Sequence, residues 1–567
     1  MLPKERQMAK AKTSASTARL GQWASDTDTT VLVVGGGING LAVFRELALQ
    51  GVPVTLVEKN DYCSGASAAS SHMIHGGIRY LENGEIRLVR ESLLERNRLL
   101  KNAPHYVKPL KTTIPIFSFF SGLLSAPFRL FFHRSGKPKE RGALLIKVGL
   151  MLYDTFGRDG GTMPRHQFAG RKKTLALMPE VNKDVRFSAH YYDAAIENPE
   201  RLAIDLLQDG LECGPHARAM NYVKAESFEG GQVVLRDELT GETLPMTASV
   251  IVNTSGPWTD ITNHGLGISS RYMGGTKGSH IVLDNPELFA ACNSREIFFE
   301  NSDGRIVLMY PLLGRVLVGT TDIPVDNPDN VECTEEEVDY FFDLVGHVFP
   351  DIALDRSQIV YRYSGVRPLP AAGDLSPGVI SRDYRIVEDT VGDVPLVSLV
   401  GGKWTTFRAI GEHMVDTVLE RLGITREVST VSLPIGGGEG FPTTEQAVER
   451  WIDEHGAGRD RDRVRQLLAR YGTTASRLLN TLGSAEETPL VHTEGYSREE
   501  IEDIVRHEAV FTLSDLVHRR TTLGFRGEVS SESLNELAEI LGSVRGWAQG
   551  DTASEVESIR VEKAVAA

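Results

Sequence analysis

Three glycines and a glutamate near the start of the chain have the types and spacing of a site for an adenine dinucleotide. Gly35, Gly37 and Gly40 fit the pattern G-x-G-x-x-G. In this pattern the first glycine permits a tight turn, the second lets a pyrophosphate approach the backbone, and the third packs a helix against a strand. Glu58 follows roughly twenty residues later, where a carboxylate accepts the ribose hydroxyls of the adenosine. A glycine-rich loop with an unrelated surface glutamate is the alternative, and the combination of the two features favours the dinucleotide.

A strand, a helix and a second strand must position these residues. Val31–Val34 are four apolar, mostly β-branched residues, which predict a buried strand. The glycines then turn the chain into a helix that runs to about Leu49, and Pro53–Val57 predict the second strand, with the glutamate at its end. The first helical residues, Ile38 and Asn39, are expected to face the phosphates with free N–H groups and the positive end of the helix dipole.

Small residues dominate the stretch from Asp61 to Leu81. A backbone with so little side-chain bulk can pass against a flat ring system. His75, Arg79 and Tyr80 come close together around two glycines, so polar groups would lie beside such a ring. A solvated loop is the alternative, which composition alone does not exclude.

Two later segments also lead from a strand into small residues. Ser249–Asn253 predict a buried strand that is followed by Thr254-Ser255-Gly256-Pro257-Trp258. Pro395–Val400 predict a central strand that runs into Gly401-Gly402-Lys403-Trp404-Thr405 and a helix to about Arg421. The second segment is another glycine-containing turn from strand to helix, whose positive end is free to face an anion.

Composition limits the class of protein. The chain has 567 residues, which predicts two or three domains. Its 41% hydrophobic and 24% charged residues are those of an ordinary soluble protein, and its net charge of −15 argues against nucleic acid as the main partner. The four cysteines are far apart and include no C-x-x-C. This spacing disfavours a zinc site, a redox-active dithiol and a disulfide framework, so no metal is expected and a reducing cytoplasm fits.

The segment of residues 114–156 combines aromatic and basic side chains in an otherwise acidic protein. It contains Phe119, Phe120, Phe131 and Phe132, with arginines and lysines between and after them. This combination suits a segment that lies in the headgroup region of an anionic membrane. A buried loop with solvated basic residues is the alternative.

The sequence predicts no membrane span, because it contains no stretch of about twenty apolar residues. Residues 1–29 are polar and lack the apolar run of a secretory signal, so they are expected to form a disordered tail.

These blocks together resemble the FAD-dependent glycerol-3-phosphate dehydrogenases. The resemblance rests on Gly35–Gly40, on Glu58 and above all on Ser70-Ser71-x-x-Ile74-His75-Gly76-Gly77-Ile78-Arg79-Tyr80-Leu81-Glu82, and later blocks extend it over most of residues 30–530. Two departures from the family pattern are local. His72-Met73 stands where the family usually has Lys-Leu, and Ala194–Asn198 stand near the place of a second family Asp.

The resemblance implies an α/β fold. It consists of an FAD-binding, Rossmann-like domain of the D-amino-acid-oxidase-like group, a mainly antiparallel substrate-binding sheet and a C-terminal α-helical domain. The FAD-binding domain is expected from residues 30–110, 185–264 and 356–430. Residues 111–184 and 265–355 are expected to form the substrate-binding, membrane-facing domain, and residues 431–567 the helical domain.

Local patterns support these divisions. The segments 305–310 and 315–320 alternate around a Pro-Leu-Leu-Gly turn, which predicts a β-hairpin of the substrate sheet. In the C-terminal part, helical spacing of apolar residues predicts helices at 444–455, 462–471, 498–509 and 531–547.

The reaction that the resemblance implies is the oxidation of sn-glycerol 3-phosphate to dihydroxyacetone phosphate. A hydride leaves C2 for N5 of FAD, and the proton of the C2 hydroxyl leaves to a base. His75 and His280 are both candidates for the base, because a neutral imidazole near its pKa is an efficient proton acceptor. Arg367 and Arg382 are expected to hold the phosphate or to position the glycerol hydroxyls, since the arginine fork binds phosphate bidentately.

Further residues are assigned through the same family motifs. Arg79 and Tyr80 are expected beside the two arginines, Thr321 as a hydrogen-bonding neighbour of the substrate, and Lys403 at the developing alkoxide or the flavin. The catalytic candidates are therefore His280, His75, Arg367 and Lys403. The residues expected to contact FAD are Gly35, Gly37, Ile38, Asn39, Gly40, Glu58, Ser70, Ser71, His75, Gly76, Gly77, Ser255, Gly256, Gly402, Lys403 and Thr405.

The expected electron acceptor is a membrane quinone, so the protein is expected in the cytoplasm, peripherally associated with the inner face of the cell membrane. The C-terminal helical domain is expected to serve packing, docking of a partner or formation of a homodimer. Three alternatives stay open: an oxidase that passes electrons to oxygen, a dehydrogenase of another polyol phosphate such as a tetritol phosphate, and a non-catalytic flavin-binding protein. An NAD-dependent dehydrogenase would share only the first motif.

Overall fold

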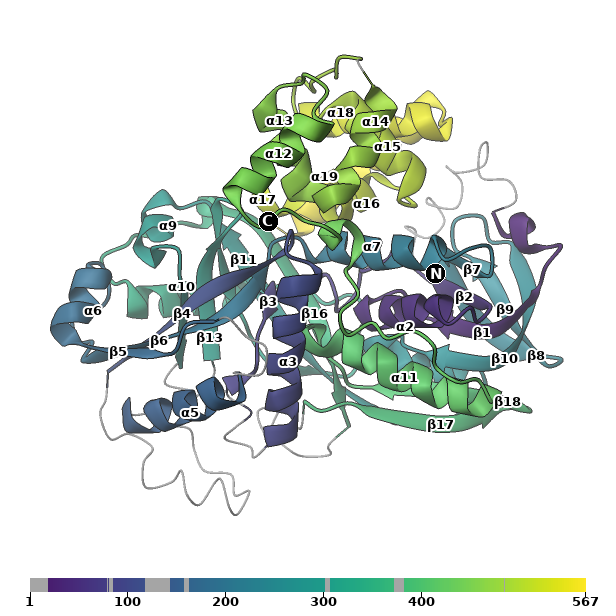
Figure 1. Ribbon diagram of the computed structural model, residues 1–567, viewed down its shortest axis with the longest axis horizontal. Coiled ribbons are helices and arrows are strands. Elements are labelled where there is room, and N and C mark those ends of the chain that lie inside the picture. Colours follow the sequence, from purple (N-terminus) through teal and green to yellow (C-terminus); the bar gives the residue numbers. More distant parts are fainter. Residues whose placement is uncertain are drawn as a thin grey trace.

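The computed structural model describes residues 19–78, 80, 85–117, 143–157, 163–300, 306–371, 382–483 and 485–566. In this part of the chain two β-sheets lie beside each other, and a group of C-terminal helices sits on top of them (Figure 1). The expected α/β fold with a mainly antiparallel second sheet and a C-terminal helical part is confirmed.

The first sheet is built on strand β1 (Asp28–Val34), whose residues Val31–Val33 are fully buried. It pairs in parallel with β2 (Val54–Glu58) on one side and β10 (Thr243–Asn253) on the other. Parallel strands that are buried on both faces are continuously apolar, as these are. The order of the sheet is β17-β18-β10-β1-β2-β7, with β17 (Arg385–Val391) antiparallel at one edge, β18 (Val394–Val400) next to it and β7 (Ala217–Asn221) at the other edge.

Helices cover one face of this sheet and a β-meander covers the other. Helix α2 (Ile38–Leu49) packs between α7 (Pro199–Leu211) and α11 (Phe407–Leu422), and all three contribute to one core with the parallel strands (Figure 1). Strands β8 (Val223–Glu229) and β9 (Gln232–Asp237) continue from β10 and shield the opposite face.

The expectation of a disordered tail over residues 1–29 is wrong for the described part of it. A short 3-10 helix, η1 (Leu20–Trp23), buries Leu20 and Trp23 against the meander side of the first sheet. The neighbouring Arg19 forms an ion pair with buried Asp237 at 3.2 Å. Residues 1–18 lie outside the described part of the chain.

The second sheet is mainly antiparallel, and its order is β15-β11-β14-β13-β12-β4-β6-β3, with β16 paired to β11 and β5 to β6. The predicted hairpin is confirmed, because β13 and β14 pair across the turn at Leu313 and Gly314. The bounds of its strands are β3 Met73–Ile74, β4 Val107–Ile116, β5 Gln167–Gly170, β6 Phe187–Ile196, β11 Met273–Leu283, β12 Glu296–Glu300, β13 Ile306–Leu312, β14 Arg315–Gly319, β15 Ile323–Val325 and β16 Ile359–Pro370.

The sheets divide the chain differently from the expected domain boundaries. Strands β6 and β16 fall in segments that were assigned to the FAD-binding domain, yet both pair within the second sheet. Hydrophobic patterning shows that such strands are buried but not which partners they have, since pairing is decided by distant residues. The expected domain boundaries at residues 185 and 356 therefore have to be shifted, so that β6 and β16 fall in the domain of the second sheet.

Two sets of helices cover the second sheet. Helices α6 (Arg171–Leu177), α9 (Pro286–Cys292) and α10 (Glu335–Val348) share one core with its outer face. Helix α3 (Ile86–Asn102) and α5 (Ala143–Phe156) pack on the opposite face (Figure 1).

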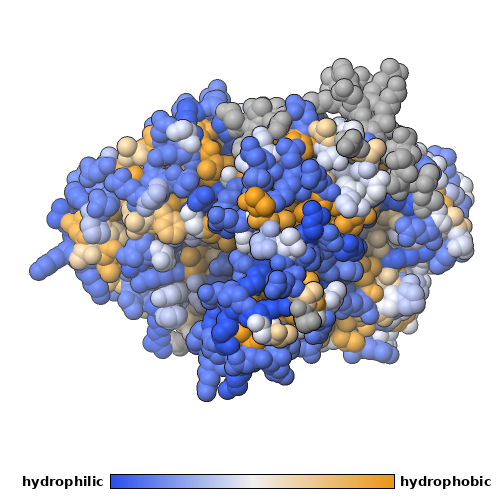
Figure 2. All heavy atoms as spheres, turned by 90° about the horizontal axis from the view of Figure 1, so that it is seen from above, coloured by the Kyte–Doolittle hydropathy of each residue, from blue (hydrophilic) through white to orange (hydrophobic). Residues whose placement is uncertain are grey.

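The C-terminal helices form two small cores of their own. Four of them match the predicted ranges, whereas α14 and the C-terminal α19, whose Val556 and Ile559 are buried, were not foreseen. This side of the molecule is mostly hydrophilic at its surface, with hydrophobic residues in separate small groups (Figure 2). The bounds are α12 Glu445–His455, α13 Arg461–Tyr471, α14 Ala475–Leu482, α15 Arg498–His507, α16 Leu513–Asp515, α17 Leu523–Arg526, α18 Ser531–Arg545 and α19 Gln549–Ala566.

A buried ion pair joins the helical part to the first sheet. Asp61, three residues after β2, accepts hydrogen bonds from the guanidinium of Arg520 at 2.8 and 2.9 Å and from that of Arg519 at 2.5 Å. The two guanidinium groups lower the pKa of the Asp61 carboxyl below its usual value. The segment just after β2 is thereby fixed from the C-terminal side.

Candidate functional site

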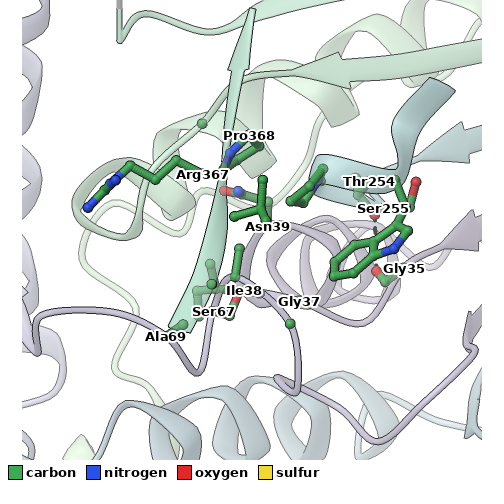
Figure 3. Close-up of a pocket in the computed structure, with 18 of the residues that line it drawn as sticks. Gly35, Gly37, Ile38, Asn39, Ser67, Ala69, Thr254, Ser255, Arg367 and Pro368 are labelled. Atoms are coloured by element: carbon green, nitrogen blue, oxygen red, sulfur yellow. Dashed lines mark hydrogen bonds between the residues drawn. The ribbon is translucent and has the colours of Figure 1, made fainter. Parts of the chain in front are cut away.

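A cavity of about 790 Å³ lies between the two sheets. The glycine-rich turn, the loop that carries Ser67 and Ala69, and the strand that carries Arg367 surround it (Figure 3). Of the residues predicted for the site, seventeen line it: Gly35, Gly37, Ile38, Asn39, Glu58, Ser70, Ser71, His75, Tyr80, Ser255, Gly256, His280, Arg367, Arg382, Gly402, Lys403 and Thr405.

The turn between β1 and α2 can be made only with glycine. Gly35 has φ +108°, and a Cβ there would lie 2.8 Å from the backbone of Ser255. A Cβ on Gly40 would lie 1.8 Å from the carbonyl oxygen of Gly35. Helix α2 begins after Gly37 with no side-chain cap, and Ser67 Oγ accepts the N–H of Ile38 at 3.0 Å. Ser67 therefore occupies the N–H of Ile38, which was expected to be free. Gly37 and Ile38 at the start of α2 line the cavity, so the positive end of the helix dipole faces it, as binding of a pyrophosphate requires.

Glu58 lies at the end of β2 and contributes to the cavity wall. Its carboxylate accepts the N–H of Gly36 at 2.7 Å and the N–H of Asn60 at 2.8 Å. Burial raises the pKa of this carboxyl, while the two N–H groups lower it. Close by, the side-chain oxygen of Asn39 is buried without a hydrogen-bond partner. These residues fit an adenine dinucleotide with its ribose at Glu58.

The second glycine-containing turn closes the cavity from the side of β18. Gly402 has φ +100°, and the short helix η6 (Trp404–Thr406) follows. Thr405 Oγ1 accepts the N–H of His75 at 3.3 Å and donates to its carbonyl at 3.2 Å. Trp404 Nε1 donates to the carbonyl of Ser67 at 2.9 Å. The segment predicted to pass against a flat ring system and the second glycine-containing turn are therefore held together.

Lys403 is buried between Tyr80 and helix α3. Its Nζ lies 4.7 Å from the centre of the Tyr80 ring and donates to Ser92 Oγ at 2.5 Å. Burial lowers the pKa of the amine to about 8. Its positive charge in turn contributes to the lowered pKa of His75, about 4, which is caused mainly by burial. His75 is therefore neutral at physiological pH.

His280 lies on β11 and is almost completely buried. Its Nε2 is 2.8 Å from Ser71 Oγ, and its ring stacks on that of Tyr363 with 4.8 Å between the centroids. Burial, together with the charge of Arg367, holds the pKa of His280 well below its usual value. His280 is therefore a neutral imidazole at the cavity wall. Ser71 fixes its ring through Nε2, and Tyr363 covers one face of the ring.

Arg367 and Arg382 converge on Asp322. Arg367 Nη1 lies 3.1 Å from one carboxylate oxygen of Asp322, and Arg382 Nη2 lies 3.3 Å from the other. Arg367 Nη2 also donates to Thr320 Oγ1 at 2.8 Å. Asp322 was not predicted as a site residue, although its place at the end of the hairpin was visible in the sequence. Two guanidinium groups around one carboxylate give this group of three side chains a net positive charge.

Four predicted residues do not line the cavity. Thr321, predicted as a hydrogen-bonding neighbour of the substrate, instead donates its hydroxyl to the buried Glu337 at 2.6 Å and accepts the N–H of Ser279 at 3.0 Å. Gly40 acts in helix packing, as the motif predicts. A Cβ on Gly76 would lie 2.4 Å from Leu93 and one on Gly77 2.2 Å from Tyr80, so these two glycines permit close packing. Arg79 lies outside the described residues.

Asp193, which was not predicted as a site residue, supports the loop that contains His75. Asp193, on β6, accepts hydrogen bonds from Arg96 at 2.8 Å, from Tyr153 at 2.6 Å and from the N–H of Gly76 at 3.2 Å. The following residues Ala194 and Ala195 pair with Ile74 and Met73. The two departures from the family pattern therefore meet in one strand pair.

Comparison with known proteins agrees with this geometry. The family model of FAD-dependent oxidoreductases matches residues 30–417, and that of the C-terminal domain of alpha-glycerophosphate oxidase matches residues 428–552. A glycerol-3-phosphate dehydrogenase of Synechocystis sp. is 32% identical over 548 residues, which cover 92% of this chain and 94% of the relative. A D-erythritol 1-phosphate dehydrogenase of Brucella abortus is 31% identical over 510 residues, 87% of this chain and 93% of the relative.

One solved structure shows the same fold over the whole chain. The glycerol-3-phosphate dehydrogenase from Bacillus halodurans complexed with FAD superimposes with a TM-score of 0.73 at 24% identity and covers 97% of this chain and 98% of its own.

Proposed function

Because the chain belongs to the family of FAD-dependent oxidoreductases that includes the glycerol-3-phosphate dehydrogenases, we propose that it oxidises sn-glycerol 3-phosphate to dihydroxyacetone phosphate. FAD is the cofactor. The observation that carries the choice of substrate is the pair of arginines, Arg367 and Arg382, at the wall of the cavity beside the neutral His280.

Each of these side chains has a task in that reaction. Bound FAD supplies the hydride acceptor. Arg367 and Arg382 hold the phosphate, since two guanidinium forks match a dianion that carries three acceptor oxygens. His280 accepts the proton of the C2 hydroxyl, and Ser71 fixes the orientation of its ring through Nε2. Lys403 contributes positive charge on the opposite wall, where negative charge develops during the transfer.

The backbone of β11 makes room for Arg367. A Cβ on Gly278 would lie 2.1 Å from Arg367 Nη2, so the guanidinium lies directly over this glycine. Gly278→Ala is expected to push the flexible end of Arg367 aside and to raise KM for sn-glycerol 3-phosphate about tenfold. The binding of FAD and the fold should not change, because the displaced atoms are the tip of a side chain. Steady-state kinetics with flavin absorbance checks this, and an unchanged KM would contradict the placement of Arg367 at the phosphate.

A second candidate substrate is D-erythritol 1-phosphate, because one of the relatives carries that name at nearly the same identity. Both compounds present a phosphate and a secondary alcohol, so the arginines and His280 would serve either. The additional carbon of the tetritol would then have to be accommodated beside the flavin, near the departures from the family pattern at His72-Met73 and Ala194–Asn198.

The test is anaerobic reduction of the purified holoenzyme. Addition of sn-glycerol 3-phosphate is expected to bleach the visible absorbance of the oxidised flavin, and D-erythritol 1-phosphate is offered in parallel. Bleaching by the tetritol phosphate alone would replace the substrate but keep the mechanism. A flavin that stays oxidised with both would refute the proposal.

For the electron acceptor we propose a membrane quinone. The support is an apolar surface on α5 and the start of α3, where Val148, Met151, Leu152 and Ile86 are each 46–54% exposed. Among the described residues no helix has the length and apolar character needed to cross a membrane. Contact is therefore proposed to be peripheral, at the inner face of the cell membrane. Of the aromatic and basic segment, residues 118–142 lie outside the described part of the chain. Reduced enzyme offered quinone or air distinguishes this proposal from an oxidase.

Replacing Val148, Met151 and Leu152 together with serine is expected to weaken binding to anionic liposomes at least about tenfold, because three apolar side chains no longer enter the interface. Flotation with vesicles measures this. Val491→Ser is the matched control, since Val491 is 80% exposed on the C-terminal part. Equal binding of the triple variant and the control variant would exclude α5 as the membrane contact.

A further inference from the structure

A buried arginine without a partner lies on the outer face of the second sheet. Arg295, directly before β12, is 8% exposed, and its Nη1 has no hydrogen-bond partner. Its side chain forms no ion pair within the described part of the chain. Burial removes the hydration of a charge, so an arginine in such a place is normally paired with an anion.

The register of the strands places two polar side chains beside it. Thr112 on β4 pairs with Glu296, so Arg295 lies next to Lys111. Lys111 in turn pairs with Tyr192 on β6. Side chains alternate between the faces of a sheet, so Arg295, Lys111 and Tyr192 form a row on one face.

A third cation comes from α6. The charge of Lys173 acts on both Lys111 and His190, and burial together with the neighbouring positive charges lowers the pKa of Lys111. His190 itself stays neutral, with its pKa lowered to about 4, mainly by burial, and its ring nitrogens lie 2.9 Å from Thr113 Oγ1 and 3.0 Å from Ser188 Oγ. The cluster therefore contains three cationic side chains, and the neutral His190 adds no further positive charge to it.

No carboxylate compensates these charges within the described residues. The neighbouring Glu296 faces the opposite side of the sheet, where it accepts the hydroxyl of Thr112 at 2.5 Å. Burial raises the pKa of Glu296 to about 8, so this carboxyl is protonated at neutral pH. In a protein with a net charge of −15, an uncompensated group of cations needs an explanation.

We propose that Arg295, Lys111 and Lys173, with the hydroxyl of Tyr192 beside them, bind the phosphate group of a second ligand. A guanidinium and two ammonium groups complement a phosphate dianion and can donate to all its oxygens. None of the four residues lines the cavity between the sheets, so the site is separate from that of the substrate. It also lies on the face opposite to α5, because α5 packs with Tyr191 rather than Tyr192.

Equilibrium dialysis of the holoenzyme against inorganic phosphate tests the proposal. Arg295→Gln and Lys111→Gln are each expected to weaken one class of bound phosphate at least about tenfold, since a charged hydrogen-bond partner is lost. Arg367→Gln identifies phosphate bound in the substrate cavity. Arg186→Gln, which removes an exposed arginine directly before β6, is the matched control and should bind like the wild type. Equal binding by Arg295→Gln and the wild type would overturn the proposal.

Thermal unfolding separates a ligand site from a structural arginine. Phosphate is expected to raise Tm of the wild type above its value in chloride of equal ionic strength, and this gain should shrink in Arg295→Gln. In phosphate-free buffer Arg295→Gln should be at least as stable as the wild type, because an unpaired buried charge is removed. A lower Tm of the variant in that buffer would show a structural role and overturn the proposal.

The same variants identify the source of the phosphate. If flotation with phosphatidylglycerol vesicles is weakened by Arg295→Gln, the phosphate belongs to a lipid headgroup. If flotation is unchanged while dialysis detects the site, it belongs to a soluble compound.

Discussion

Replacing Arg367 with glutamine is expected to lower kcat/KM for sn-glycerol 3-phosphate by about 10²- to 10³-fold, with most of the loss in KM. The reason is the balance of charge at the wall of the cavity. Asp322 contacts both Arg367 and Arg382, so the net positive charge of this group depends on having two arginines. Without Arg367, the charges of Arg382 and Asp322 cancel. This pair then has no net positive charge with which to attract a phosphate dianion.

The measurement is steady-state kinetics combined with flavin content. FAD content should be unchanged in Arg367→Gln, because we place the dinucleotide at the glycine-rich turn and Glu58, and the guanidinium of Arg367 points away from Asn39 (Figure 3). Arg385→Gln is the matched control: it removes the same charge from an exposed residue three positions after Arg382. A comparable loss in the control, or loss of FAD from Arg367→Gln, would contradict the assigned role.

Replacing His280 with asparagine is expected to lower kcat by about 10²- to 10⁴-fold, the range lost with a general base, while FAD content stays near stoichiometric. His280 is the better placed of the two histidines. Its ring is fixed by Ser71 and Tyr363. It also lies two residues after Gly278, the glycine over which the guanidinium of Arg367 lies. The rate of anaerobic flavin reduction measures the effect directly, with the exposed His492→Asn as control.

The pH profile tests the same assignment independently. Burial and the positive charge of Arg367 hold the pKa of His280 well below 6.5, so the imidazole accepts a proton down to a pH below that value. Activity should fall only at lower pH, when the ring becomes protonated. In Arg367→Gln one of the causes of the lowered pKa is removed, the pKa of His280 rises, and the acid limb should move to higher pH. An acid limb that stays in place, or a larger loss in His75→Asn than in His280→Asn, would transfer the role of base to His75.

Local features of the sequence were sufficient to predict the strand, the glycine turn and the helix at which we place the cofactor. Gly35, Gly37 and Gly40 are required by a backbone that leaves no space for a Cβ, and such a requirement appears directly as residue type. Glu58 follows at the end of the next strand, so its position relative to the turn is set by a short stretch of chain. Four helices of the C-terminal part were predictable for a similar reason, because the spacing of apolar residues within one helix is a local property.

The substrate end of the cavity depended on residues that are far apart in the chain. Arg367, Arg382 and Asp322 come from three different segments, and nothing in the spacing of the sequence brings the carboxylate to the two arginines. Thr320 and Thr321 are neighbours, yet the first contacts Arg367 and the second contacts the buried Glu337. Which of two adjacent side chains faces a cavity is decided by the path of the backbone after the strand, and this path is fixed by tertiary contacts.

The sequence by itself thus determined the strand–turn–helix at which we place the dinucleotide, the resemblance to the FAD-dependent family, and seventeen of the residues that line the cavity. Only the tertiary structure decided that β6 and β16 belong to the second sheet, that Asp322 neutralises part of the arginine pair, and that Arg295 is left without an anion. The physical reason is the same in each case. Backbone conformation and the periodicity of burial are set by neighbouring residues, whereas the pairing of strands and the compensation of charges are set by residues that meet only after folding.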